Sequence, residues 1–169
     1  MNNKFFCFDT ETTGVAWNDE ILSLAIVDQD YYVLFNKRFK PVRKIEWPNA
    51  QAVHGISPED VKDCLPILAY KKEIIDIFSN YNLVIGYNVG FDFRMLEHDL
   101  GIDFTIGCIV KDVMLDFARI YGEKGKYGSY KWQKLVTCAK YYNYQFNAHD
   151  ALEDVKATIY CYKKMEGIN

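Results

Sequence analysis

The chain has few of the patterns that mark membrane, secreted or zinc-binding proteins. No apolar run approaches the roughly 18 residues of a membrane span, and the first residues run straight into an apolar segment rather than a signal peptide. The five cysteines are odd in number, and none stands in a C-x-x-C pair. Several lie inside apolar runs, so we expect reduced core thiols in a cytoplasmic protein, without disulfides or zinc and without a membrane partner.

An excess of positive charge is also missing. Lys and Arg number 20 against 23 Asp and Glu, which gives a net charge of −3. Proteins that bind nucleic acid over a broad surface are usually basic, so this balance by itself disfavours such a surface. With 50% hydrophobic and 25% charged residues, the 169-residue chain has the composition of a globular protein. We expect residues 1–169 to form a single domain with a sizeable core.

The hydrophobic pattern predicts an α/β protein with a mixed sheet. Strand-like runs occupy residues 4–8, 21–27, 31–39, 83–87 and, weakly, 108–110. Helices are expected from residue 57 onward and at 66–80, 91–100, 112–121, 131–142 and 150–165. Residues 28–30 are short enough for a hairpin, and the later strands are separated by helices, which indicates crossover connections. Functional sites in such sheets lie at the carboxyl ends of the strands.

Carboxylates follow two of the predicted strands. Asp9 and Glu11 are two residues apart after the first strand, so in an extended chain they face the same side and repel each other unless a cation lies between them. Asp92 follows the strand at 83–87, at the start of a helix. The alternatives are an acidic solvated loop for the first pair and a helix-dipole role for Asp92. Asp99 falls in the same helical arc as Asp92, which weakens the argument for Asp92.

A third acidic cluster begins the last helix. Asp150 and Glu153 form the N-cap and N3 pair of a capping box, so His149 stands just before the helix. Placing residues every 100° puts Asp154 away from the solvated stripe of this helix. An inward carboxylate must be paired or bind a metal, and the basic residues nearest in sequence point elsewhere.

These signals together place four carboxylates and one histidine at compatible ends of elements in one domain. The set offers oxygen ligands without thiolates or a histidine pair, which favours Mg²⁺ or Mn²⁺ over zinc. Asp9, Glu11, Asp92 and Asp154 are suited to holding two divalent cations about 4 Å apart, the arrangement used for in-line phosphoryl chemistry. An imidazole such as that of His149 can take a proton from water at neutral pH.

The motifs FDTETTG, NVGFD and HDALED resemble those of the DEDD exonuclease superfamily, in the same order. The histidine five residues before the last aspartate is similar to the DnaQ-like (DEDDh) branch, which includes the epsilon proofreading subunit of bacterial DNA polymerase III, ribonuclease T and oligoribonuclease. The segment AVHGI at 52–56 also resembles the family. The resemblance spans residues 8 to about 155. Tyr87 departs from it, since a histidine often stands there, and so does Gly90, where a bulkier residue is common.

The resemblance implies a ribonuclease H-like fold, a mixed five-stranded sheet flanked by helices, and a metal-dependent 3′-5′ exonuclease that releases nucleoside 5′-monophosphates. It implies that Asp9, Glu11 and Asp154 bind a first cation, with Asp9 bridging to a second that Asp92 supports through water. His149 would be the general base. The remaining implied contacts concern the terminal nucleotide: Val53, His54 and Phe91 border its base, and the backbone near Thr12 contacts its sugar.

Single-stranded or frayed DNA is the favoured substrate, in proofreading or repair with a DNA polymerase as partner. An exoribonuclease or oligoribonuclease-like activity is the alternative, and so is a non-catalytic nucleic-acid-binding module, although intact acids and His149 argue against the latter. The oligomeric state stays open. Two basic segments, residues 37–44 and 124–134, are candidates for contacting the strand, the second because its lysines accompany Tyr127, Tyr130 and Trp132. Two bound cations would add +4 and bring the net charge near +1, so the charge does not exclude a polyanion.

Overall fold

The computed structural model describes residues 4–168, and its centre is a five-stranded sheet in the order β3-β2-β1-β4-β5. The strands are β1 (Phe5–Thr12), β2 (Ile21–Asp28), β3 (Val33–Arg38), β4 (Leu83–Gly86) and β5 (Ile109–Asp112). β2 pairs antiparallel with β1 and β3, whereas β4 pairs parallel with β1 and β5. The predicted mixed sheet of five strands flanked by helices is confirmed.

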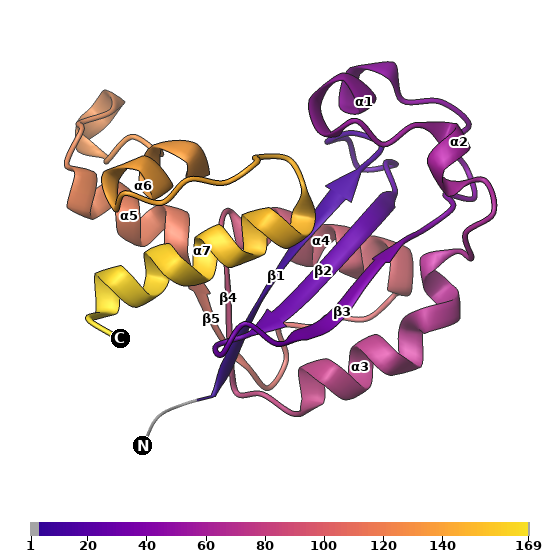
Figure 1. Cartoon of the computed structure of the whole chain (residues 1–169), viewed down its shortest axis with the longest axis horizontal. Coiled ribbons are helices and arrows are strands. Elements are labelled where there is room, and N and C mark those ends of the chain that lie inside the picture. Colours follow the sequence, from indigo (N-terminus) through magenta and orange to yellow (C-terminus); the bar gives the residue numbers. More distant parts are fainter. Residues whose placement is uncertain (1–3, 169) are drawn as a thin grey trace.

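Helices cover both faces of this sheet (Figure 1). They are α1 (Pro48–His54), α2 (Pro58–Val61), α3 (Lys71–Ser79), α4 (Val89–Leu100), α5 (Val113–Tyr121), α6 (Leu135–Tyr141) and α7 (Ala151–Glu166), with short 3-10 turns η1 (Ile67–Tyr70) and η2 (Lys126–Gly128). Within residues 4–168, no helix is both long and apolar enough to cross a membrane.

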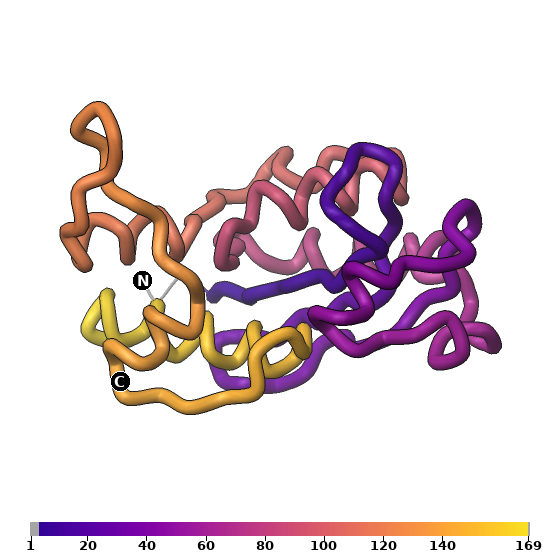
Figure 2. Tube along the Cα trace, turned by 90° about the horizontal axis from the view of Figure 1, so that it is seen from above, coloured from indigo at the N-terminus to yellow at the C-terminus, as the bar shows by residue number. Residues whose placement is uncertain are grey.

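Alternation along β1 divides the core into two layers. Phe6 and Phe8 pack with α3 and α4 on one face of the sheet, while Phe5 and Cys7 pack with α5, α6 and α7 on the other. Figure 2 shows β1 running between α4 and α7. Because side chains alternate along a strand, the odd-numbered residues that follow Cys7 point toward the α7 face, where the core gives way to polar residues.

Several predicted elements differ from the structure at their ends. The helix α1 was not predicted, and the helix predicted at 131–142 begins only at Leu135. The prediction at 66–80 is a 3-10 turn followed by α3. The third strand begins at Val33 rather than at residue 31, because Asp28 accepts hydrogen bonds from the backbone N–H groups of Asp30 and Tyr32 and closes a longer turn. All five cysteines are free thiols, as expected, although Cys64 and Cys108 are only half-buried.

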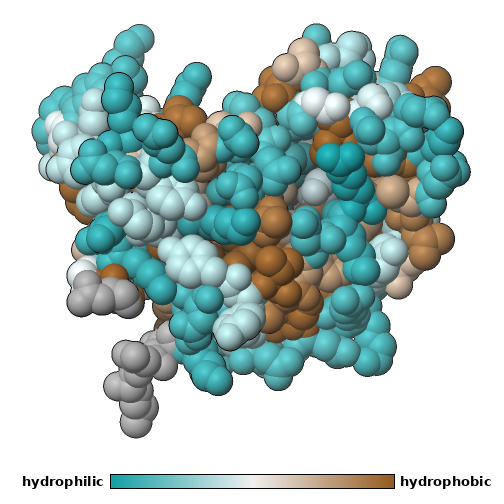
Figure 3. Space-filling view, viewed as in Figure 1, coloured by the Kyte–Doolittle hydropathy of each residue, from teal (hydrophilic) through white to brown (hydrophobic). Residues whose placement is uncertain are grey.

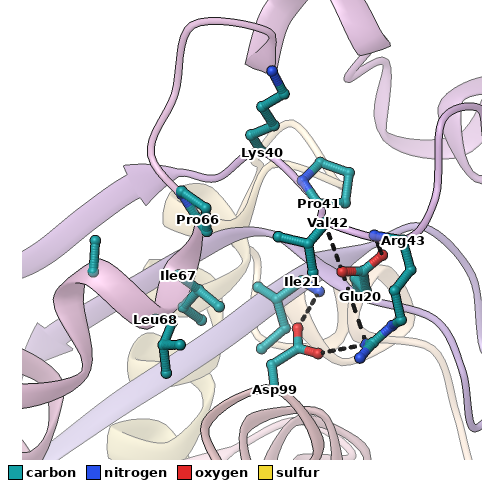
Figure 4. A pocket seen from close by; sticks show the side chains of 11 residues that line it. Glu20, Ile21, Lys40, Pro41, Val42, Arg43, Pro66, Ile67, Leu68 and Asp99 are labelled. Carbon is teal, nitrogen blue, oxygen red and sulfur yellow. Dashed lines mark hydrogen bonds and ion pairs between the residues drawn. The ribbon is translucent and has the colours of Figure 1, made fainter.

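Two acidic side chains outside the predicted site are tied to the backbone. In a pocket of about 570 Å³ between η1 and the segment after β3, Glu20 accepts hydrogen bonds from the N–H groups of Val42, Arg43 and Lys44 at 2.8–2.9 Å (Figure 4). Asp99 accepts one from the N–H of Ile21 and one from the Arg43 guanidinium. Asp99 therefore faces inward because it binds the backbone of Ile21 and the side chain of Arg43. Its place in the same helical arc no longer weakens the argument for a functional role of Asp92.

Replacing Glu20 by alanine is expected to lower the free energy of unfolding by about 3 kcal/mol, because three backbone donors lose a charged acceptor that is 3% exposed. Urea denaturation followed by circular dichroism measures the change. Glu46 is exposed, so Glu46→Ala is the matched control and should change stability by no more than about 0.5 kcal/mol. Equal stability of the two variants would contradict the role of Glu20.

Candidate active site

The end of β1 carries the first two acidic residues on the face that α7 covers. Asp9 pairs in register with Ala25 and Glu11 with Ser23, so both carboxylates lie on the same face as Cys7 and both are half-buried. The strand continues through Thr12, beyond the apolar run that ended the prediction at residue 8. An extended backbone at residues 9–11 is what holds the two side chains on one face.

The start of α7 brings a third carboxylate and the histidine to this place. Asp150 caps the helix by accepting from the N–H groups of Leu152 and Glu153, while Glu153 pairs with Lys156 rather than reaching back to complete a capping box. The backbone N–H of His149 donates to both oxygens of Asp154, at 3.2 and 3.4 Å. Ligand atoms of Glu11, His149 and Asp154 lie within 4.8 Å of one another.

Asp92 lies at the same carboxyl end of the sheet, but it comes from the layer on the opposite face. It lies in the first turn of α4, is 3% exposed, and its Oδ1 accepts from the backbone N–H of Thr10 at 3.0 Å and from the Thr10 hydroxyl at 2.6 Å. Asn88 precedes the helix in a left-handed conformation, and its N–H donates to Asp112. Thr10 was missed from the sequence, although its place between Asp9 and Glu11 was a signal, because side chains alternate and Thr10 must face α4.

Burial raises the pKa values of all four carboxylates, and repulsion within the set adds to the shift at Asp9 and Glu11. Burial, and then repulsion by Asp92, raises the pKa of Asp9 well above its usual range. Burial and the Asp154 charge raise the pKa of Glu11 to about 8, and burial raises those of Asp92 and Asp154 to about 7. Within residues 4–168, no lysine or arginine forms an ion pair with any of the four.

A cluster of oxygen ligands that lacks a counter-charge fits divalent cations. The positive charge that would allow all four groups to ionise together at neutral pH must come from outside the chain. The donor set of carboxylates with one imidazole suits hard cations such as Mg²⁺ or Mn²⁺. Glu11, His149 and Asp154 bring their ligand atoms together, whereas Asp9 and Asp92 are tied to this group by charge, since Asp92, Asp154 and Glu11 all raise the pKa of Asp9.

The pKa shifts predict a stability profile for the metal-free protein. Glu11 has a pKa of about 8 when folded and about 4.3 when unfolded, so the folded state holds the extra proton between these values. This contribution is fully present below about pH 4 and is lost as the pH rises through about 8. We expect the unfolding free energy in EDTA to fall from about pH 5 to about pH 8.5, and Mn²⁺ to restore it at the upper end.

Denaturation series at several pH values measure this profile. Glu11→Gln should flatten it, whereas Glu97→Gln, on the exposed side of α4, should leave it unchanged. Identical pH profiles for the unmodified protein and for Glu11→Gln would contradict the expected profile.

The residues expected to contact a terminal nucleotide lie around the end of β1. His54, the last residue of α1, accepts the Ile56 N–H at Nδ1, so Nε2 carries the proton and donates to the Thr12 carbonyl at 3.1 Å. Burial lowers the pKa of His54, which favours this neutral form. The Thr12 hydroxyl donates to the Gly14 carbonyl. The side chain of Thr12 is therefore engaged within the chain.

Val53 and Phe91 are the apolar residues expected to border the terminal base. Val53 is 56% exposed on α1, and Phe91 is half-buried with the Arg94 guanidinium 5.2 Å from its ring centroid. A polar hollow of about 200 Å³ adjoins the cluster and brings in residues of β2 and β3, one of them from the basic segment 37–44. Besides Glu11, His54 and His149, its lining includes Ser23, Asn36 and Arg38.

A mixed sheet with four carboxylates and an imidazole at the ends of its central elements defines a protein of the ribonuclease H-like class. Residues 6–162 match the model of the RNase_T family, described as "Exonuclease". The chain therefore belongs to this exonuclease family.

Two curated relatives resemble the chain over most of its length. One is the uncharacterized exonuclease CP81 of Escherichia phage 186, 31% identical over 162 residues that cover 89% of this chain and 82% of that protein. The other is RNA exonuclease 4 of Saccharomyces cerevisiae, 29% identical over 169 residues, with 95% of this chain and 54% of that protein covered.

Solved structures of exonuclease I share the fold. The Escherichia coli protein in complex with a dA16 oligonucleotide superposes with a TM-score of 0.74 at 20% identity, covering 96% of this chain and 41% of that one. The complex with dT13 gives 0.76 at 21% identity, with 98% and 41% covered. The enzyme of Methylocaldum szegediense gives 0.71 at 25% identity, with 96% and 40% covered. The chain thus spans about two fifths of the length of these structures.

Proposed function

We propose that the protein is a metal-dependent 3′-5′ exonuclease that removes nucleoside 5′-monophosphates from single-stranded or frayed DNA. The observation that carries the proposal is the meeting of four carboxylates without a cationic partner and an exposed imidazole, at one edge of the sheet of an exonuclease-family chain. Neither a helix-dipole role nor a solvated loop explains why Asp9 and Asp92, from opposite layers, share this place.

The reaction is hydrolysis of the last phosphodiester. Two divalent cations held by Asp9, Glu11, Asp92 and Asp154 would neutralise the phosphate and make water more acidic when bound. His149 takes the proton from the attacking water as the new P–O bond forms. The bond from phosphorus to the 3′-oxygen of the preceding nucleotide breaks, and this oxygen takes a proton from solvent, which leaves a nucleoside 5′-monophosphate and a shortened chain with a 3′-hydroxyl.

The chain's other site residues hold the terminal nucleotide. The neutral His54 fixes the backbone at Thr12, next to Glu11, where the terminal sugar would bind. Val53 and Phe91 offer apolar surface for the base, and the guanidinium of Arg94 orients the Phe91 ring. Stacking of this kind tolerates every base, as an exonuclease requires.

DNA is the proposed substrate because the structures that share the fold include complexes with dA16 and dT13. RNA is the second candidate, favoured by the 29% identity to an RNA exonuclease. We further propose membership of the DnaQ-like branch, based on His149, and a role in proofreading or repair beside a DNA polymerase. The reduced thiols are compatible with a cytoplasmic protein.

A nuclease assay tests the proposal. Oligonucleotides of DNA and of RNA, labelled at the 5′ end, are incubated with Mg²⁺ or Mn²⁺, and products are resolved by length. We expect a ladder that shortens one nucleotide at a time, with 5′-monophosphates released and all cleavage stopped by EDTA. Release of mononucleotides from the 5′ end, or cleavage that continues in EDTA, would falsify the assignment. Faster shortening of the RNA would select the second candidate.

A further inference from the structure

The segment between α5 and α6 gathers exposed aromatic rings and lysines that the site does not use. Residues 123–134, here called the lysine–tyrosine loop, contain Tyr127, which is fully exposed, Tyr130 at 39% and Trp132 at 64% exposure. The loop also carries four lysines and a single glutamate. Among residues 4–168, only Lys131 of these lysines is in an ion pair, with Glu123. Large rings held in water beside unpaired lysines favour a surface that binds a partner.

Hydrogen bonds within the loop fix its shape. Lys124 and Tyr130 form an antiparallel bridge, Gly125 N–H donates to the Ser129 carbonyl at 2.8 Å, and Lys131 N–H donates to the Glu123 carbonyl at 2.9 Å. At the tip, Tyr127 has a φ of 60°, a left-handed conformation that is uncommon for a tyrosine. Its ring is therefore presented to solvent by a closed hairpin rather than by an extended chain.

The base of the loop is hydrogen-bonded to the residue that precedes the segment carrying Asp92. The Tyr87 hydroxyl donates to the Gln133 carbonyl at 2.8 Å, and Tyr87 immediately precedes the segment 88–92 that carries Asp92. Tyr87 is the residue that departs from the histidine often seen in the family, and here its hydroxyl reaches the loop. Figure 3 shows the molecule hollowed at its upper edge between two raised parts, one over α5 and α6 and the other over α1.

We propose that the lysine–tyrosine loop binds the single strand on the 5′ side of the terminal nucleotide. The inference rests on the proposed function and extends it from the scissile bond to the strand that leads to it. Tyr127 and Trp132 would stack on successive bases, while Lys124, Lys126 and Lys134 face the phosphates. The Lys124 ammonium already lies 3.7 Å from the centroid of the Tyr130 ring, so cation and ring form one patch.

This placement explains how a protein with a net charge of −3 can hold a polyanion. Four of the 20 lysines and arginines lie in this short hairpin, and the rings add attraction that does not depend on charge. Because every base has a π-face, such a grip would not select a sequence. It would give the enzyme a preference for strands long enough to reach from the carboxylates to the loop.

The first experiment separates the loop from the chemistry. The double variant Tyr127→Ala/Trp132→Ala is compared with the unmodified protein on a dodecathymidylate and on the p-nitrophenyl ester of thymidine 5′-monophosphate, which is too short to reach the loop. We expect KM for the dodecamer to rise about tenfold or more, since each stacked ring contributes substantially to binding. Hydrolysis of the ester should stay within about twofold.

Tyr32→Ala is the matched control, because Tyr32 is 71% exposed in the turn between β2 and β3 at the opposite end of the sheet. An unchanged KM for the dodecamer, or an equal loss on both substrates, would overturn the proposal. Fluorescence anisotropy with labelled dodecathymidylate in EDTA measures binding without hydrolysis. If the unmodified protein binds but hydrolyses neither substrate, the proposed function fails while the loop is still tested.

The second experiment measures the charge contribution. Lys124→Ala/Lys126→Ala should reduce the slope of log Kd against log salt by about 1.4, since each phosphate contact on a single strand contributes about 0.7. Lys71→Ala/Lys72→Ala, on α3, is the control and should leave the slope unchanged. A slope for the loop variant equal to that of the control would show that these lysines do not meet phosphates.

Discussion

Asp9→Asn is expected to lower kcat on a single-stranded oligonucleotide by about 10³-fold or more, with the fold intact. The carboxylate stands at the meeting point of Glu11, Asp92 and Asp154, and it is the one that the other three repel together. An amide cannot supply the charge that draws a divalent cation into this place. The loss of several kcal/mol of charge stabilisation corresponds to three or more powers of ten in rate.

The same substitution should stabilise the metal-free protein. A neutral side chain of equal size removes repulsion within a buried cluster, so the Tm in EDTA should rise while the increase caused by Mn²⁺ disappears. Thermal unfolding with and without Mn²⁺ measures both effects beside the rate. Asp63→Asn, on an exposed position after α2, is the control that should change neither. More than about a tenth of the activity remaining in Asp9→Asn would remove Asp9 from the mechanism.

The predictable part of the fold rested on patterns that packing enforces. The apolar run of β1 is buried on both faces, and the spacing of buried residues in α4 and α7 required each helix to cover a sheet face. The start of the last helix could be predicted from Asp150, because this N-cap side chain binds backbone groups within three residues of itself. Local chemistry of this kind can be read from the sequence.

The parts that failed were those determined by distant contacts. The helix α1 begins at Pro48, and Trp47 before it offers no capping side chain, so only the proline indicated a start. The helix predicted at 131–142 was too long because residues 131–134 close the lysine–tyrosine loop against Glu123 and Tyr87. No periodicity within the segment reveals partners that lie so far away in sequence.

The candidate site shows the same division. The motifs placed the four acids and His149 at strand and helix ends, but not the bond between Thr10 and Asp92, which joins residues 82 apart. Nor could the spacing show that Asp99 accepts a hydrogen bond from the backbone N–H of Ile21. A helical wheel gives a direction for each side chain, whereas the partner in that direction depends on the whole fold.

His149→Gln is expected to lower kcat by about 10²–10⁴-fold while KM for the same oligonucleotide changes little, the effect of removing a general base. The geometry supports this role. His149 has a φ of 70°, its backbone N–H donates to both oxygens of Asp154, and a ring nitrogen lies within 4.8 Å of carboxylate oxygens of Glu11 and Asp154. Glutamine keeps the polarity and the backbone donor but cannot accept the proton of water.

His98→Gln is the matched control, because His98 lies on α4 against Asp99 and Arg43, apart from the cluster. The kcat of this variant should equal that of the unmodified protein. A rise in KM with unchanged kcat for His149→Gln would make His149 a substrate contact instead. The combination Asp9→Asn/His149→Gln gives the sharper test. Groups that act as one unit are not additive, so the pair should fall no more than about tenfold below the more impaired single variant. If the loss of kcat in the double variant equals the product of the two single losses, the cluster and the imidazole act in separate steps.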